Sequence, residues 1–129
     1  MSDASADPLM SVLLVEDEAL LRMDAAEFLA EEGFIVIGSG TGEHAASVIG
    51  GHPDDMHILF TDVHLPGTLN GVQLAHLARK RWPSIAILIV SGRTQPSQED
   101  MPPGSRFLPK PYAPHIVIRH LRALVAPSS

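Results

Sequence analysis

Two kinds of hydrophobic pattern alternate along the 129-residue chain. The first is a short run of apolar residues, which is typical of a strand buried on both faces of a sheet. Such runs predict strands at residues 11–18, 34–40, 57–62, 84–92 and 106–111. The second repeats with the helical period and predicts helices at residues 18–33, 42–51, 70–83 and 112–126.

The first and last predicted helices are amphipathic. The first is expected to bury one face, formed by Leu21, Ala25, Phe28 and Leu29. Gly33 stands where a left-handed residue ends such a helix. The last helix is expected to bury an apolar stripe of Val117, Leu121, Leu124 and Val125.

The third helix has clear end signals, whereas the segment that follows the fourth strand has none. Asn70 and Gln73 are expected to form a capping box, and Pro83 to end the helix. Residues 94–105 contain three prolines, which remove backbone donors and disfavour helix in the residues before them. We expect this segment to hold at most one helical turn, in the tetrapeptide SQED.

Strands that alternate with helices indicate a parallel sheet with helices on both faces. Right-handed crossovers make all the strands point the same way, so their carboxyl ends open onto one edge. Ligands of such folds bind at this edge, where the strand order reverses. The pattern therefore predicts a doubly wound α/β fold with a binding site at the strand ends.

Composition narrows the class of protein. With 45% hydrophobic residues, the chain is predicted to form one domain at residues 11–127, after a flexible tail at residues 1–10. No window approaches the roughly 20 apolar residues of a membrane span, and the start lacks a signal-peptide pattern, so we expect a cytoplasmic protein without membrane contact. The lack of cysteine fits a reducing compartment. A net charge of −6 argues against direct binding of nucleic acid.

Polar residues end four of the predicted strands. They are Glu16 and Asp17 after the first strand, Asp62 after the third, Ser91 after the fourth and Lys110 after the fifth. A single acid at a strand end is usually a helix cap or a solvated turn residue. Three carboxylates at one edge, however, repel one another unless a cation lies among them, and an all-oxygen set of ligands suits Mg²⁺. Lys110 would then face a phosphoryl group, and Ser91 would offer it a hydroxyl.

The stretches that carry these residues resemble the receiver domain of response regulators in two-component signalling. They are VLLVEDE, ILFTDVHLP, ILIVSG and FLPKPY, and the resemblance covers residues 11–126. It implies a flavodoxin-like five-stranded sheet of order 2-1-3-4-5, here with a shortened or irregular fourth helix. It also implies transfer of a phosphoryl group from a histidine kinase or a histidine phosphotransfer protein to an aspartate, with Mg²⁺ or alternatively Mn²⁺ as cofactor. Such a domain catalyses only its own phosphorylation and dephosphorylation.

The resemblance implies roles for the acidic residues. Asp62 resembles the phosphoacceptor and contributes to the metal site. Asp17 resembles the direct metal ligand, with Glu16 acting largely through water. His64 stands at the position whose backbone carbonyl binds the metal, and its side chain is expected to point outward.

The resemblance also implies how phosphorylation is transmitted. Ser91 matches the hydroxyl that follows the phosphoryl group, and Phe107 matches the switch aromatic. Lys110 matches the family's lysine, and Pro111 resembles a proline preceded by a cis peptide bond. One departure is the stretch DVHLPGTLNG, which is one residue longer than the family's common spacing, so we expect a locally different loop after the third strand.

Two other functions fit the sequence less well. A Mg²⁺-dependent aspartyl-phosphate phosphatase needs DxD at the first strand, whereas DVH follows the third strand here. A flavin-binding module needs a hydroxyl- and glycine-rich loop after the first strand, where this chain has EDEALL. The seven histidines show no paired zinc-ligand spacing, and GSGTGEHAAS is interpreted as a tight turn before a helix.

The expected partners follow from the resemblance. We expect a stand-alone receiver, without an output domain after Ser129, that binds a downstream protein of unknown identity; the alternative is a receiver that is part of a longer hybrid kinase. The family's common dimer uses the helix that residues 94–105 cannot form. We therefore expect a monomer or a weak homodimer, built mainly on the first or last helix.

Overall fold

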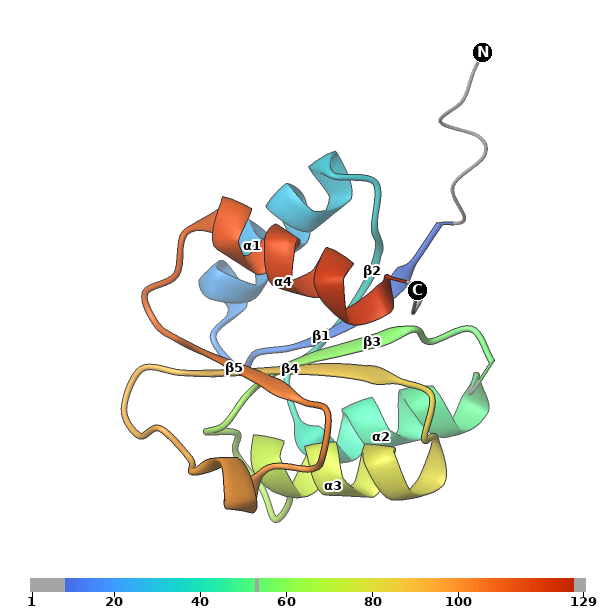
Figure 1. The fold of residues 1–129 in the computed structure, drawn as a ribbon, viewed down its shortest axis with the longest axis vertical. Helices are drawn as coiled ribbons and strands as arrows, with labels where there is room; N and C mark the ends of the chain where they lie inside the picture. Colours follow the sequence, from blue (N-terminus) through green and yellow to red (C-terminus); the bar gives the residue numbers. More distant parts are fainter. Residues whose placement is uncertain (1–8, 53, 127–129) are drawn as a thin grey trace.

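A computed structural model describes residues 9–52 and 54–126 of the chain. Within them lies a parallel sheet of five strands in the order β2-β1-β3-β4-β5 (Figure 1). The strands are β1 (Ser11–Val15), β2 (Ile35–Ser39), β3 (Ile58–Asp62), β4 (Ala86–Ser91) and β5 (Arg106–Pro109). The helices are α1 (Ala19–Glu31), α2 (Gly42–Gly51), α3 (Gly71–Arg81) and α4 (Pro114–Val125), with a 3-10 turn η2 (Gln98–Asp100). The predicted doubly wound fold is confirmed.

The sheet separates two hydrophobic cores. Helices α1 and α4 cover one face, and α2 and α3 cover the other (Figure 1). Side chains alternate between the faces of a strand, so Leu13 and Val15 of β1 pack in the core with α2 and α3, whereas Val12 and Leu14 pack in the core with α1 and α4. Because both faces are covered, the central strands are apolar at consecutive positions.

The predicted helix ends are confirmed where the structure shows their hydrogen bonds. Asn70 Oδ1 accepts from the amide of Gln73, and Gln73 Oε1 accepts from the amide of Asn70, each at 2.8 Å. This capping box begins α3, which ends two residues before Pro83. Gly33 ends α1 with a φ of 93°.

One expected core position is wrong. Ala25 and Leu29 of α1 are buried as predicted, and Phe28 is half-buried. Leu21, however, is 42% exposed. The first turn of α1 lies beside the ends of the strands, so Leu21 lines cavities there and does not pack on the sheet. In α4, Val117 and Leu121 are buried, and Leu124 and Val125 are partly buried.

The connection between β4 and β5 is irregular, as expected. Its helical part is the single turn η2, in which the Ser97 side chain accepts from the amide of Asp100 at 3.3 Å. Met101, the residue after this turn, is buried in the core beside α3. The expectation of at most one helical turn in residues 94–105 is confirmed.

The predicted tail falls mostly on residues 1–8, which lie outside the described residues, as does Pro127. Leu9 is exposed, and the carbonyl of Met10 accepts from the amide of Ile35 at 2.9 Å. The domain boundaries stay predictions. Among the described residues, none of the helices has the length and apolar character needed to cross a membrane.

Candidate functional site

The carboxyl ends of β1 and β3 bring together the predicted acids. Within the described residues, Glu16, Asp17 and Asp62 are the one group of potential metal ligands whose ligating atoms all lie within 4.8 Å of one another. Glu16 and Asp62 are buried, whereas Asp17 is exposed. A buried carboxylate needs a compensating partner, because low polarity disfavours its charged form.

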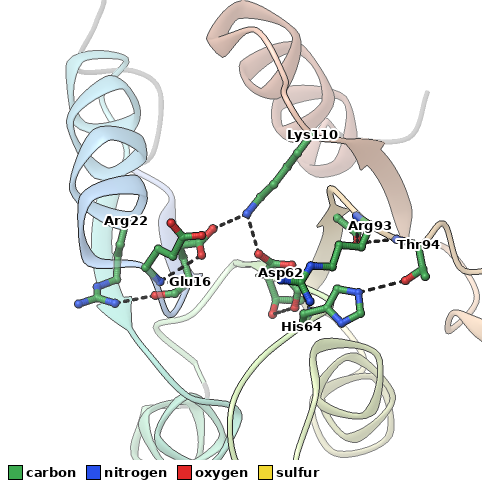
Figure 2. Close-up of polar contacts among 10 residues, drawn as sticks. Glu16, Arg22, Asp62, His64, Arg93, Thr94 and Lys110 are labelled. Atoms are coloured by element: carbon green, nitrogen blue, oxygen red, sulfur yellow. Dashed lines mark hydrogen bonds and ion pairs between the residues drawn. The ribbon is translucent and has the colours of Figure 1, made fainter.

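Lys110 supplies that partner from the end of β5. Its Nζ lies 2.6 Å from Glu16 Oε1 and 2.6 Å from Asp62 Oδ2, so one ammonium group bridges two carboxylates (Figure 2). Burial acts to lower the pKa of Lys110, but its hydrogen bonds to Asp62 and Glu16, together with the charges of these two carboxylates, outweigh this effect and raise the pKa above its ordinary value. Burial raises the pKa of Glu16, although Lys110 and the amide of Glu18 hydrogen-bond to its carboxylate.

Asp62 is held rigidly by its own backbone surroundings. Its Oδ1 accepts from the amide of His64 at 3.1 Å. A Cβ atom at Gly71, the first residue of α3, would lie only 1.7 Å from the Asp62 carbonyl oxygen, so only glycine fits there. The Gly71 amide donates to Val63 O at 2.8 Å. The start of α3 therefore packs tightly against the end of β3 and holds the backbone of Asp62, which carries the carboxylate, in place.

Ser91 lies at the end of β4, beside the acidic group. Its hydroxyl is buried and accepts from the amides of Arg93 and Thr94 at 3.3 and 3.4 Å. The side chain of His64 is exposed, and its Nε2 lies 3.1 Å from Thr94 Oγ1 (Figure 2). This contact joins the loops after β3 and β4. It was not predicted, because no sequence pattern relates residues 30 positions apart.

A cavity of about 380 Å³ opens over these groups. It is lined by residues that include Asp17, Leu21, Asp62, His64, Arg93 and Lys110. Acids, a lysine and an arginine thus share one solvent-accessible space, which suits a polar, multiply charged ligand.

The remaining predicted residues lie close to this edge. Phe107 of β5 pairs with Ile89 and is partly buried against the core beside α3. The amide of Lys110 donates to Ser91 O at 2.9 Å, which holds the ends of β4 and β5 together. The Lys110–Pro111 peptide bond is cis, as the resemblance implied.

The site residues fit a divalent cation. The donors are carboxylate oxygens, the ligands that Mg²⁺ prefers. Lys110 alone does not balance the three carboxylates, and the exposed Asp17 leaves the group open to solvent. Sequence reasoning missed Arg22, whose Nη1 donates to Glu16 O at 2.6 Å behind the acids (Figure 2).

The chain belongs to the response regulator receiver domain family, whose model matches residues 12–122. It is therefore a receiver domain of two-component systems, as the resemblance of its motifs indicated.

Two curated relatives illustrate the match. The chain is 37% identical over 120 residues to the transcriptional regulatory protein PdtaR of Mycobacterium tuberculosis. The aligned region covers 87% of this chain and 55% of PdtaR. It is 31% identical to part of the sensor kinase CckA of Brucella abortus, covering 80% of this chain and 11% of that protein. The chain thus spans about half the length of PdtaR.

Solved structures share the fold. A response regulator receiver protein of Sinorhizobium medicae superposes with a TM-score of 0.81 at 27% identity, over 90% of this chain and 94% of that chain. The chemotaxis protein CheY4 of Vibrio cholerae superposes with a TM-score of 0.80 at 20% identity, over 92% of this chain and 100% of that chain. The second likeness supports the fold alone.

Proposed function

We propose that the chain accepts a phosphoryl group on Asp62 in a Mg²⁺-dependent reaction and thereby switches the binding of a partner protein. The observation that carries this proposal is the buried Asp62 carboxylate, 2.6 Å from Lys110 Nζ and beside Glu16 and Asp17. A nucleophile of this kind must be fixed in place and still open to a donor, and Asp62 both lines the cavity and is held by the start of α3.

The phosphodonor is a phosphohistidine of a histidine kinase or of a histidine phosphotransfer protein. A carboxylate oxygen of Asp62 attacks phosphorus, the phosphorus–nitrogen bond breaks, and the departing imidazole keeps the electron pair and takes up a proton. Lys110 stabilises the negative charge on the transferred oxygens. Asp17, Asp62 and the His64 backbone carbonyl, with Glu16 acting through water, would hold Mg²⁺ or Mn²⁺, which when bound neutralises charge on the phosphoryl group.

The response to phosphorylation begins at Ser91. Its hydroxyl accepts from the amides of Arg93 and Thr94, so turning toward the phosphoryl oxygens would give up those two bonds. Phe107, on the neighbouring strand, would then move inward. Each state has its own contacts, which a two-state switch requires.

The domain acts as a signalling module and catalyses only its own phosphorylation and dephosphorylation. We propose a cytoplasmic protein that is a monomer or a weak homodimer and makes no direct contact with nucleic acid or membrane. The relatives PdtaR and CckA are named as a transcriptional regulatory protein and a sensor kinase. These names support the proposal that the partners of this chain belong to two-component signalling. A phosphatase-like reaction is not favoured, because His64 stands where a second acid would follow Asp62.

Incubation with acetyl phosphate and Mg²⁺, followed by intact-mass measurement, tests the proposal. We expect wild type to gain the mass of one phosphoryl group, and Asp62→Asn or removal of metal by EDTA to abolish the gain. Asp24→Asn, at an exposed acid of α1 outside the acidic group, is the matched control and should be labelled like wild type. Full labelling of Asp62→Asn would refute the assignment of the acceptor.

A further inference from the structure

Arg22 reaches from α1 to the backbone behind the acidic group. Its Nη1 donates to the Glu16 carbonyl oxygen at 2.6 Å, and the Glu16 amide donates to Ser39 O of β2 at 3.0 Å. Figure 2 shows the guanidinium on the side of Glu16 that faces away from Lys110. The arginine therefore bonds to the backbone of Glu16 and not to the carboxylates of the acidic group.

Two glycines leave room for this side chain. A Cβ atom at Gly38 would lie 3.3 Å from Arg22 Cδ, and one at Gly40 would lie 3.4 Å from Arg22 Nη1. The first distance is slightly below ordinary van der Waals contact and the second is at its lower end, so a Cβ at Gly38 would require Arg22 to shift by a few tenths of an ångström and a bulkier side chain there would require a larger shift. The end of β2 thus has a second reason for its glycines, besides the tight turn that the sequence predicted.

The bonded carbonyl belongs to the peptide group that joins Glu16 to Asp17. Lys110 holds the side chains of Glu16 and Asp62, whereas the exposed Asp17 lies outside that ion pair. The direction of the Asp17 side chain depends on the orientation of its backbone. Fixing the preceding peptide group therefore restricts where the Asp17 carboxylate can lie.

We propose that Arg22 is a positioning residue that aims Asp17 at the cation of the acidic site; this inference rests on the proposed metal-binding function. Two effects of Arg22 on cation binding have opposite signs. Its positive charge, behind the acidic group, repels a metal cation. Its hydrogen bond holds the ligand in place, and the positioning effect is the larger one.

The opposite signs make Arg22→Met a decisive variant. Loss of the charge alone would tighten Mg²⁺ binding, whereas loss of the hydrogen bond loosens it. Residues that orient metal ligands typically change metal affinity by roughly 10- to 100-fold, so we expect Arg22→Met to bind Mg²⁺ about tenfold or more weakly. Isothermal titration of the unphosphorylated full chain with Mg²⁺ measures this, after thermal unfolding has shown that the variant is folded.

Gly38→Val tests the same geometry without a change of charge. A β-branched residue suits a strand, and its bulk would push Arg22 away, so weaker Mg²⁺ binding is expected here too. Arg119→Met, at an exposed arginine of α4, matches the charge change of Arg22→Met and should bind Mg²⁺ at least as tightly as wild type. Gly38→Val also decides the question if Arg22→Met does not fold.

A readout without metal separates positioning from electrostatics. Hydrogen exchange at the amides of Asp17 and Glu18 should be faster in Arg22→Met than in wild type, and unchanged in Arg119→Met. Wild-type or tighter Mg²⁺ binding in a folded Arg22→Met or Gly38→Val protein would overturn the inference. Failure of wild type itself to bind Mg²⁺ would instead overturn the proposed metal site.

Discussion

The connections on either side of β4 are built in different ways. From β3 to β4 the chain forms the eleven-residue helix α3, which buries Leu74, Ala75 and Ala78 against the sheet. From β4 to β5 it forms the three-residue turn η2, which buries none of its residues. The first connection is stabilised mainly by apolar contact, and the second needs other attachments.

Those attachments come from α3 itself. His76 Nε2 lies 2.7 Å from the carbonyl oxygen of Asp100. Arg79 Nε donates to Pro103 O of the second connection at 3.1 Å, whereas its Nη1 donates to Pro83 O and Ile85 O, just before β4, at 2.8 Å. Met101 adds the apolar contact of one buried side chain. A segment held by a few hydrogen bonds opens more easily than one held by a packed face, so the two connections should differ in local stability.

The largest effect is expected in the sheet that both connections share. Ile87 of β4 is fully buried in the core beside α3. Truncating such a side chain to alanine typically costs about 2–5 kcal/mol, so Ile87→Ala should lower the free energy of unfolding by that amount. Urea unfolding measures it. Ile35→Ala, at a residue of the edge strand β2 that is 46% exposed, should cost far less; equal losses would contradict this view of the core.

An intermediate effect is expected for Arg79→Met. Burial lowers the pKa of Arg79, yet a guanidinium stays charged at neutral pH, so its bonds to backbone carbonyls are charge-assisted. Their loss should cost about 1–3 kcal/mol and loosen both the second connection, at Pro103, and residues 83–85 before β4. Hydrogen exchange should speed up across residues 94–105 and 83–85 and remain slow in the core of α3. Lys80→Met, at the exposed neighbouring residue, is the control, and equal acceleration of these segments and of the core of α3 would contradict a local role.

The smallest effect is expected for Glu43, which attaches the loop before α3 to α2. Its Oε2 accepts from the Thr68 hydroxyl and amide, each at 2.8 Å, and these hydrogen bonds lower the pKa of Glu43 below its ordinary value of 4.5. A lowered pKa means that the stabilisation is present above pH 4.5 and is lost as the pH falls through the folded-state value. Glu43→Gln should therefore be less stable than wild type at neutral pH, and the difference should shrink in acid. Since the carboxylate is exposed, a large difference that is independent of pH would argue against this contact.

Much of this architecture is readable from local sequence. The capping box of Asn70 and Gln73 and the prolines of residues 94–105 act through the adjacent backbone, so their outcomes were predictable. The same holds for the acids at the strand ends, because parallel strands deliver their carboxyl ends to one edge. The prediction that Leu21 is buried was wrong because the helical pattern of apolar residues extends to Leu21, whereas the sheet does not extend far enough for Leu21 to pack on it.

The sequence alone therefore determined the order of the elements, the fold class, and the convergence of Glu16, Asp17, Asp62, Ser91 and Lys110 at one edge. Only the tertiary structure decided which groups restrain that edge. Arg22 bonds to a carbonyl, and it does so through space that Gly38 and Gly40 leave open. Arg79 and His76 likewise bond to backbone carbonyls of a distant segment. Every residue carries a backbone carbonyl, so the sequence of side chains does not indicate which carbonyl accepts a given hydrogen bond. Only the folded backbone shows which carbonyl lies within reach of Arg22, His76 or Arg79.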